Sequence, residues 1–223
     1  MHPALYLPVA RRVYRDVPDR VVGPDTELVI EGSPRSGNTF VVAAFELAQR
    51  RPVRVVHHLH AAAQVLEAVR RGIPTLVLIR HPLDSATSHM LREPWISPRQ
   101  ALLAWIRFYG PLVAVRERIL LVPFERATHD LGSVIGEVNR RFHTGFDEFR
   151  HSEDNVARVF EEIERGNRAN FGVLTEITVA RPSRERDERK RELRRRLEHR
   201  SLAPLRARAQ SIHDSLLSCD VSA

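Results

Sequence analysis

Lysine is almost absent from this chain, since Lys190 is the only one among 223 residues. The positive charge is therefore carried almost entirely by arginine, and the formal net charge is +7. A guanidinium group binds anions through parallel N–H groups, whereas an ammonium group acts as a point charge. The scarcity of lysine excludes any mechanism that needs a lysine in the N-terminal part of the chain.

Cysteine is equally scarce, because Cys219 stands alone near the C-terminus. A single cysteine excludes an intramolecular disulfide and favours a reducing compartment. The first ten residues are interrupted by Pro3 and Pro8 and lack the apolar run of a signal peptide. No stretch approaches the ~20 apolar residues of a membrane span. We therefore predict a cytoplasmic protein without a membrane span.

Aromatic residues make up only 6% of the chain, while hydrophobic residues make up 43%. This composition is typical of a folded domain, and the length favours a single domain over residues 1–223. The net charge should attract phosphates, sulfates, nucleic acid or an acidic membrane surface. Few aromatics are available for base stacking and no known nucleic-acid module is present, so a nucleic-acid partner is not expected. The sequence does not indicate an oligomeric state.

Short apolar runs alternate with helical patterns along the chain after a lead-in segment, 1–26, that shows no sustained period. The patterns predict strands over 27–31, 53–57, 75–80 and 118–124. They predict helices over 39–49, 61–70, 84–91, 97–109, 131–142, 152–166, 184–199 and 202–217. Alternating strands and helices indicate a parallel sheet. We expect a three-layer α/β/α fold with about four to five strands, similar to P-loop nucleotide triphosphatases, and a mainly helical part over 144–223.

A loop of small residues, Gly32-Ser33-Pro34-Arg35-Ser36-Gly37-Asn38-Thr39, follows the first predicted strand. Small residues allow backbone N–H groups to converge on an anion at the N-terminus of the next helix. The two glycines have the spacing of the phosphate loop Gly-x-x-x-x-Gly-Lys-Ser/Thr, but Asn38 stands where that motif has its lysine. This departure argues against a magnesium-dependent phosphotransferase, which remains an alternative.

A second polar segment, Arg80 to Ser88, follows the third predicted strand. Ligands of open parallel sheets bind outside the carboxyl ends of the strands, so both segments should face one crevice. Arg80 and Ser88 could together hold a second phosphate. We expect Asp84 to cap the following helix and to orient the arginine.

Together the two segments resemble the sulfotransferases that use 3′-phosphoadenosine 5′-phosphosulfate (PAPS). Their first motif, Pro-Lys-Ser-Gly-Thr-Thr-Trp, is similar to Pro34-Arg35-Ser36-Gly37-Asn38-Thr39-Phe40. Their second motif has an arginine, an aspartate four residues later and a serine eight residues later, as in Arg80, Asp84 and Ser88. Pro123-Phe124-Glu125 resembles a third segment of the family. The chain departs from the family at Arg35 and Asn38.

The resemblance implies a donor site and a product, 3′-phosphoadenosine 5′-phosphate (PAP), with no metal. Residues 35–39 would bind the 5′-phosphosulfate: Arg35, Ser36, Gly37, Asn38 and Thr39. Arg80 and Ser88 would bind the 3′-phosphate. Phe40 would stack on adenine.

Three histidines, His57, His58 and His60, cluster where the second predicted strand ends. In the family a catalytic histidine precedes the arginine of the second motif by 22 residues, and here that position is His58. The resemblance implies that His58 is the general base that takes the proton of the acceptor, with His60 in reserve and Arg35 stabilising the leaving group. A metal site or a purely structural role are the alternatives for the cluster.

The acceptor cannot be identified from the sequence beyond a hydroxyl or amine on a small molecule or saccharide. Residues 90–105 and 144–175 should build its pocket, with four aromatic residues as candidates for its lining: Trp95, Trp105, Phe108 and Tyr109. At helical spacing such residues are more often part of the core. By analogy with the family, Arg181-Pro182-Ser183-Arg184 should close over the nucleotide. A non-enzymatic nucleic-acid-binding protein remains the other alternative, supported by the charge and the arginine-rich segment 184–199.

Overall fold

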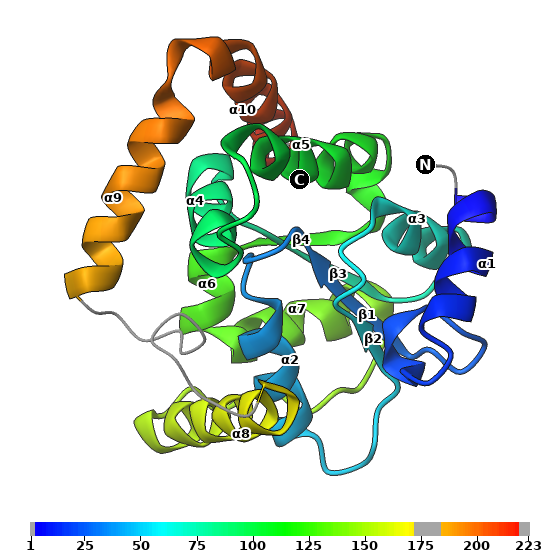
Figure 1. Ribbon diagram of the computed structural model, residues 1–223. Helices are drawn as coiled ribbons and strands as arrows, with labels where there is room; N and C mark the ends of the chain where they lie inside the picture. The colour runs from blue at the N-terminus through cyan, green and yellow to red at the C-terminus, as the bar shows by residue number, and fades with distance from the viewer. Residues whose placement is uncertain (1–2, 172–183, 219–223) are drawn as a thin grey trace.

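The computed structural model describes residues 3–171 and 184–218. Its centre is a four-stranded parallel sheet in the order β2-β1-β3-β4 (Figure 1). The strands are β1 (Leu28–Gly32), β2 (Val55–His57), β3 (Thr75–Ile79) and β4 (Leu120–Pro123). Register is set by pairs such as Ile30 with His57 and Ile30 with Leu76. The predicted fold class is therefore confirmed, with four strands.

Helices cover both faces of the sheet (Figure 1). The helices on one face are α2 (Asn38–Ala48), α7 (Leu131–Phe142) and α8 (Glu153–Phe171). Those on the other are α1 (Pro3–Val13), α3 (Ala62–Arg70), α5 (Pro98–Tyr109) and α10 (Ala203–Leu217). Side chains alternate along a strand, so Leu76 and Leu78 face α2 and α7 while Val77 and Ile79 face α3 and α5. All of β3 is buried, as expected for a central parallel strand.

The remaining helices frame the carboxyl ends of the strands. They are α4 (Pro82–Arg92), α6 (Phe124–His129) and α9 (Arg184–Glu198). Three 3₁₀ segments lie in connections elsewhere in the chain: Pro18–Arg20, Gly110–Arg118, which leads into the amino end of β4, and Arg200–Leu202. Helix α4 leaves directly from the end of β3, and α9 lies beside α4. Helix α6 was not predicted. It has only six residues and follows β4 directly, so it is too short to show a helical pattern of hydrophobic residues.

The prediction of an irregular lead-in over residues 1–26 was wrong. Helix α1 occupies much of it, and its buried residues Leu7 and Ala10 pack with Val29 of β1 and Ala63 of α3. Two prolines conceal this helix in the sequence. Pro3 is its first residue, where its missing N–H costs no hydrogen bond, and contact with the core stabilises the helix despite Pro8.

Candidate active site

The glycine-containing loop lies between β1 and α2, at the carboxyl end of the sheet. Gly37 is the cap residue of α2 and has a left-handed backbone with φ 96°, which glycine adopts without strain. A Cβ on Gly37 would lie 2.9 Å from the Phe124 ring, and a Cβ on Gly32 would lie 2.8 Å from the carbonyl oxygen of Leu78. Since Gly37 has no side chain to accept from the first amides of α2, these donors are suited to an anion.

Hydrogen bonds to two neighbouring helices hold the loop in place. The Tyr109 hydroxyl, from the end of α5, donates to the carbonyl of Leu78 (2.6 Å) and accepts from the amide of Ser33 (3.2 Å). It also contacts the Ser36 hydroxyl (3.0 Å), and the Ser85 hydroxyl of α4 lies 3.1 Å from that of Ser33. Sequence reasoning missed Tyr109 and Ser85 as supports of the loop.

The predicted anion ligand Ser36 is turned inward. Its hydroxyl contacts Ser33 and Tyr109, and its amide donates to the carbonyl of Ser33 (3.2 Å). Ser36 therefore shapes the loop from within, and a direct contact between its side chain and the donor stays a prediction.

The two predicted anion-binding segments touch each other. Nε of Arg35 donates to the hydroxyl of Ser88 (3.2 Å), and Nη1 of Arg80 donates to the carbonyl oxygen of Arg35 (3.2 Å). The guanidinium of Arg80 lies over the ring of Phe124, 4.2 Å from its centroid, and the Trp105 indole donates to the Arg80 carbonyl (3.1 Å). Arg35 and Arg80 thus form one cationic group, joined to Ser88, at the carboxyl ends of the two central strands, β1 and β3.

Asp84 does not have the capping role expected from the sequence. His81 occupies the cap position of α4, and Asp84 lies in the first turn, where its carboxylate forms an ion pair with Arg194 of α9. This pair joins two helices that are far apart in the sequence, so no local pattern could reveal it.

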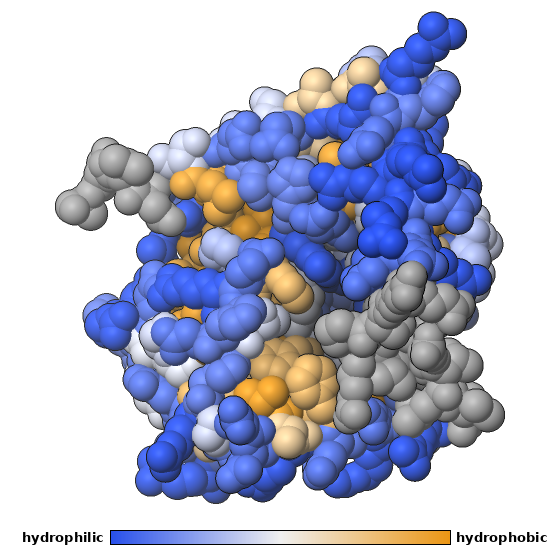
Figure 2. Space-filling model, turned by 90° about the vertical axis from the view of Figure 1, so that its left-hand side faces the viewer, coloured by the Kyte–Doolittle hydropathy of each residue, from blue (hydrophilic) through white to orange (hydrophobic). Residues whose placement is uncertain are grey.

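A cleft of about 880 Å³ opens between α4 and α9, beside Arg80 and Ser88. Its lining includes two acidic side chains, Asp84 and Glu188, but cationic side chains outnumber them, and helix α9 contributes four of these: Lys190, Arg191, Arg194 and Arg195. Thr87 also lines the cleft, and its buried hydroxyl has no hydrogen-bond partner among the described residues. The side of the molecule on which α9 lies is largely hydrophilic, with a hollow near its centre (Figure 2). The cleft extends the cationic group of Arg35 and Arg80, and it is suited to a polyanionic ligand.

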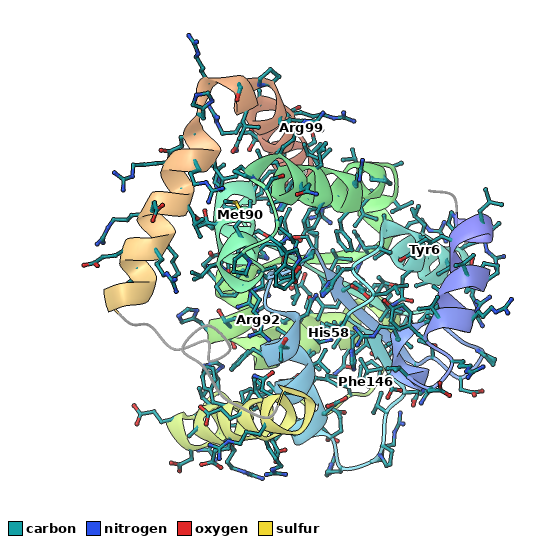
Figure 3. The ribbon with its side chains drawn as sticks, in the orientation of Figure 1. Tyr6, His58, Met90, Arg92, Arg99 and Phe146 are labelled. Atoms are coloured by element: carbon teal, nitrogen blue, oxygen red, sulfur yellow. The ribbon has the colours of Figure 1, made fainter. Side chains whose placement is uncertain are left out.

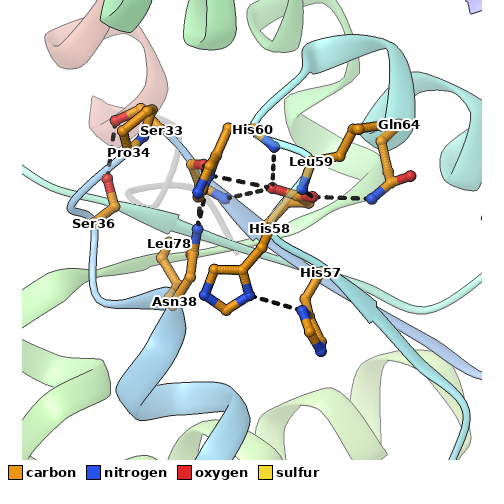
Figure 4. Close-up of polar contacts among 12 residues, drawn as sticks. Ser33, Pro34, Ser36, Asn38, His57, His58, Leu59, His60, Gln64 and Leu78 are labelled. Carbon is orange, nitrogen blue, oxygen red and sulfur yellow. Dashed lines mark hydrogen bonds and ion pairs between the residues drawn. The ribbon is translucent and has the colours of Figure 1, made fainter. Parts of the chain in front are cut away.

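The histidine cluster lies at the end of β2, next to the start of α2. Figure 3 shows His58 near the centre of the molecule, and Figure 4 shows the contacts of the cluster. Both ring nitrogens of His58 are engaged, Nδ1 with Nδ1 of His57 (2.7 Å) and Nε2 with the hydroxyl of Thr39 (3.1 Å). Burial, with nearby His57, His60 and Arg20, lowers the pKa of His58 to about 3.

His60 is held differently. Its Nδ1 lies 2.8 Å from the carbonyl oxygen of Gly32. A carbonyl can only accept, so Nδ1 carries the proton and Nε2 has a free electron pair. Burial, with Arg20, His89 and Arg35 as further causes, lowers the pKa of His60 to about 4, against the Gly32 hydrogen bond, which raises it. His60 therefore has the tautomer that a general base needs.

Glu31 is a buried acid beside this cluster that sequence reasoning missed. Its carboxylate accepts from the amides of Leu59 (2.8 Å) and His60 (3.2 Å) and from Nε2 of Gln64 (2.9 Å). Burial raises the pKa of Glu31 to about 7, although these hydrogen bonds lower it. The available signal was a charged residue at the end of an otherwise apolar strand.

The other predicted donor-site residues differ in where they point. Thr39 is exposed, as a ligand contact requires. Asn38 is buried, and its Nδ2 lies 3.3 Å from the Gly32 carbonyl and 3.2 Å from Nδ1 of His60. The centroid of the Phe40 ring lies 5.8 Å from the centroid of the Phe160 ring of α8. Stacking of Phe40 on adenine stays a prediction.

Among the expected acceptor-pocket aromatics, Trp105, Phe108 and Tyr109 are buried in the core, and only Trp95 is exposed. Arg181, Pro182 and Ser183, expected to close over the nucleotide, lie outside the described residues, as does Cys219. Within residues 3–171 and 184–218, no cluster of three or more histidine, cysteine, aspartate or glutamate side chains is arranged to hold a metal ion. Within the same ranges no helix is both long and apolar enough to cross a membrane.

Comparison with models of known protein families gives no match, and comparison with curated proteins gives none either. Among solved structures, the chain matches the crystal structure of the mouse sulfotransferase SULT7A1 complexed with PAP. The sequence identity is 11% and the TM-score is 0.43, over 89% of this chain and 92% of that chain. At this level of similarity the match carries no argument about function.

Proposed function

We propose that this protein is a PAPS-dependent sulfotransferase that transfers a sulfuryl group to a hydroxyl or amine of a small-molecule or saccharide acceptor. One observation carries the proposal: Arg35, Arg80 and Ser88 are joined by hydrogen bonds of 3.2 Å, so the two predicted anion-binding segments lie in direct contact. A donor with anionic groups at both the 5′ and 3′ positions of its ribose would use both segments at once.

The donor's two ends are assigned to different parts of this crevice. The amides at the start of α2 and the side chain of Arg35 would hold the 5′-phosphosulfate. Arg80 and Ser88 would hold the 3′-phosphate, and the cationic side chains of α9 that line the adjoining cleft would add positive potential. The exposed hydroxyl of Thr39 would lie beside the sulfuryl group.

His60 is the better candidate for the base on the geometry, although the resemblance favours His58. The Nε2 electron pair of His60 has no partner among the described residues, while both ring nitrogens of His58 are engaged. In the proposed step the acceptor oxygen or nitrogen bonds to sulfur, and the bond from sulfur to the bridging phosphate oxygen breaks. Nε2 takes the acceptor's proton, and PAP leaves with the electron pair.

Arg35 and the loop amides would stabilise the negative charge that grows on the bridging oxygen as this bond breaks. Donors that are already fixed in place need little reorganisation during the reaction, and such stabilisation often contributes more to catalysis than any other effect. The loop meets this condition because hydrogen bonds from Ser33 and Ser36 to Tyr109 and Ser85 fix its position. The prediction that no metal takes part rests on the resemblance.

A thermal-shift experiment separates the proposed function from its two alternatives. The protein is heated with PAP, with ATP and magnesium, or with a mixed-sequence oligonucleotide. The proposal predicts that PAP raises the melting temperature, because a ligand that binds only the folded state stabilises it. Stabilisation by ATP and magnesium alone would instead favour a phosphotransferase. Oligonucleotide binding that falls steeply with salt, without any effect of PAP, would favour a nucleic-acid-binding protein.

A further inference from the structure

The carboxylate of Glu31 is fully buried at the end of β1, with 0% of the residue exposed. Its hydrogen-bond partners are N–H donors, and the closest are the amides of Leu59 and His60 and the side-chain amide of Gln64 (Figure 4). A buried carboxylate is unfavourable unless its oxygens accept hydrogen bonds. Glu31 is therefore tied to the turn that follows β2.

That turn has an uncommon backbone. His58 and His60 both have left-handed conformations, with φ 59° and φ 54°, and neither is a glycine. A Cβ makes this conformation unfavourable, so two such residues within three persist only where their surroundings hold them. The amides that Glu31 binds belong to Leu59, between the two, and to His60 itself.

The conformation of the turn decides where the His60 ring points. With this backbone, Nδ1 reaches the carbonyl of Gly32 at 2.8 Å. Gly32 is the next residue after Glu31, so the end of a single strand binds both the main chain and the ring of His60. Loss of the main-chain contact would release the ring contact with it.

We propose that Glu31 is a positioning residue: its carboxylate holds the turn from His58 to His60 and thereby fixes His60 in the tautomer that presents Nε2 to the acceptor. This inference rests on the proposed function and deepens it. Because Glu31 is fully buried, it would touch neither donor nor acceptor and would act through the backbone of the histidine turn.

Gln64 extends the same network to the N-terminal segment. Its side-chain oxygen accepts from the amide of Val22 (3.0 Å), and its amide nitrogen donates to the carbonyl of Arg20 (3.1 Å) as well as to Glu31. The guanidinium of Arg20 in turn donates to the carbonyl of His58. The turn is therefore held both from β1 and from the segment after α1. Within this network, Glu31 is the residue that accepts hydrogen bonds from the backbone amides of the turn.

The variant Glu31→Gln tests the proposal because it keeps the shape of the side chain and places an NH₂ group against an N–H donor. We expect kcat to fall about 10- to 100-fold, as for other residues that orient a catalytic group. The dissociation constant of PAP should stay within about twofold, since Glu31 bonds to none of the side chains assigned to the donor and touches the loop only at the amide of Gly32. Glu31→Asp, which keeps the charge with a shorter reach, should restore part of kcat.

A spectroscopic measurement reports on the turn without any need for activity. Imidazole ¹⁵N NMR distinguishes a protonated Nδ1 from a protonated Nε2, and the variant His60→Asn assigns the His60 signals. The wild type should show His60 with the proton on Nδ1, and Glu31→Gln should show a mixture of tautomers. Asn139→Ala is the matched control, because Asn139 also bonds both main-chain groups of a loop residue, Phe146, away from the site.

The control Asn139→Ala should lower the stability of the protein and leave both the His60 tautomer and kcat as in the wild type. If Glu31→Gln also leaves both unchanged, or if Asn139→Ala changes the tautomer equally, the positioning role is wrong. If the wild type does not bind PAP, the proposed sulfotransferase function fails, while the NMR comparison still decides whether Glu31 holds His60. The two failures are thus distinguishable.

Discussion

Nε of Arg35 donates a hydrogen bond to the hydroxyl of Ser88 across 3.2 Å, although the two residues are 53 positions apart in the sequence. The first belongs to the loop after β1 and the second to the helix after β3. Because β1 and β3 are paired in parallel, their carboxyl ends lie side by side and bring the two segments together. The proposed donor site is this junction.

Replacement of each histidine by alanine should separate their roles. His60→Ala should reduce kcat by about 100-fold or more, because loss of a general base removes a contribution of that size. His58→Ala should have the smaller effect, since its ring nitrogens are already engaged with His57 and Thr39. PAP affinity should be retained in both variants. If kcat falls more in His58→Ala than in His60→Ala, His58 and not His60 is the general base.

The pH dependence of kcat/KM should lack the acidic limb that titration of an ordinary histidine base produces, and any acidic limb should follow protonation of Glu31, whose pKa burial raises to about 7. The pKa values of His58 and His60 are lowered to about 3 and about 4. Both rings therefore stay neutral as the pH falls from 8 to 6, whereas a histidine with the usual pKa near 6.5 would lose its base form over that range. Imidazole signals of His58 or His60 that titrate near pH 6.5 in the free protein would contradict this prediction.

Gly37→Ala should destabilise the protein and abolish PAP binding. The left-handed backbone alone costs a residue with a Cβ about 1–2 kcal/mol, and the new Cβ would also meet the Phe124 ring at 2.9 Å. Gly72→Ala is the matched control. Gly72 also has a left-handed backbone, with φ 72°, but a Cβ added there would have no other atom within 4 Å. Denaturant unfolding should show the greater loss of stability for Gly37→Ala. Equal losses would mean that the Phe124 contact is unimportant.

Helix α1 offers a matched pair of leucines that tests whether it belongs to the folded core. Leu7 is 3% exposed and Leu5 is 72% exposed. Leu7→Ala should lower the free energy of unfolding by about 2–5 kcal/mol, as for other buried leucines. Leu5→Ala should change it by less than about 0.5 kcal/mol. Similar small effects of both substitutions would show that α1 is not docked on the sheet.

Features that depend only on residues close together in the sequence could be predicted from it. The sequence Ser97-Pro98-Arg99-Gln100 has the pattern of a capping box, and the start of α5 contains one, with the Ser97 hydroxyl accepting from the Gln100 amide at 3.3 Å. The loop between β1 and α2 could be found because its glycines are needed for close backbone contacts. The spacing of Arg80 and Ser88 located the second segment by resemblance.

The remaining features depend on contacts between distant residues. Glu31 bonds to His60, 29 positions away, and Asp84 pairs with Arg194, 110 positions away. No periodicity or motif encodes such pairs, since each partner alone is compatible with many environments. The preference for His60 over His58 likewise depends on a ring contact with Gly32, which only the folded backbone determines.

The affinity of the protein for PAP, measured by isothermal titration calorimetry, tests the central claim most directly. The account predicts that the wild type binds PAP and that Arg80→Ala weakens binding by about 10- to 100-fold, because a charge-assisted hydrogen bond is worth about 1.5–3 kcal/mol. Ser88→Ala should weaken it by about 2- to 10-fold. Arg99→Ala, an exposed arginine at the edge of the molecule (Figure 3), should bind as the wild type does. Absence of PAP binding by the wild type, or equal losses in the Arg80 and Arg99 variants, would contradict the account.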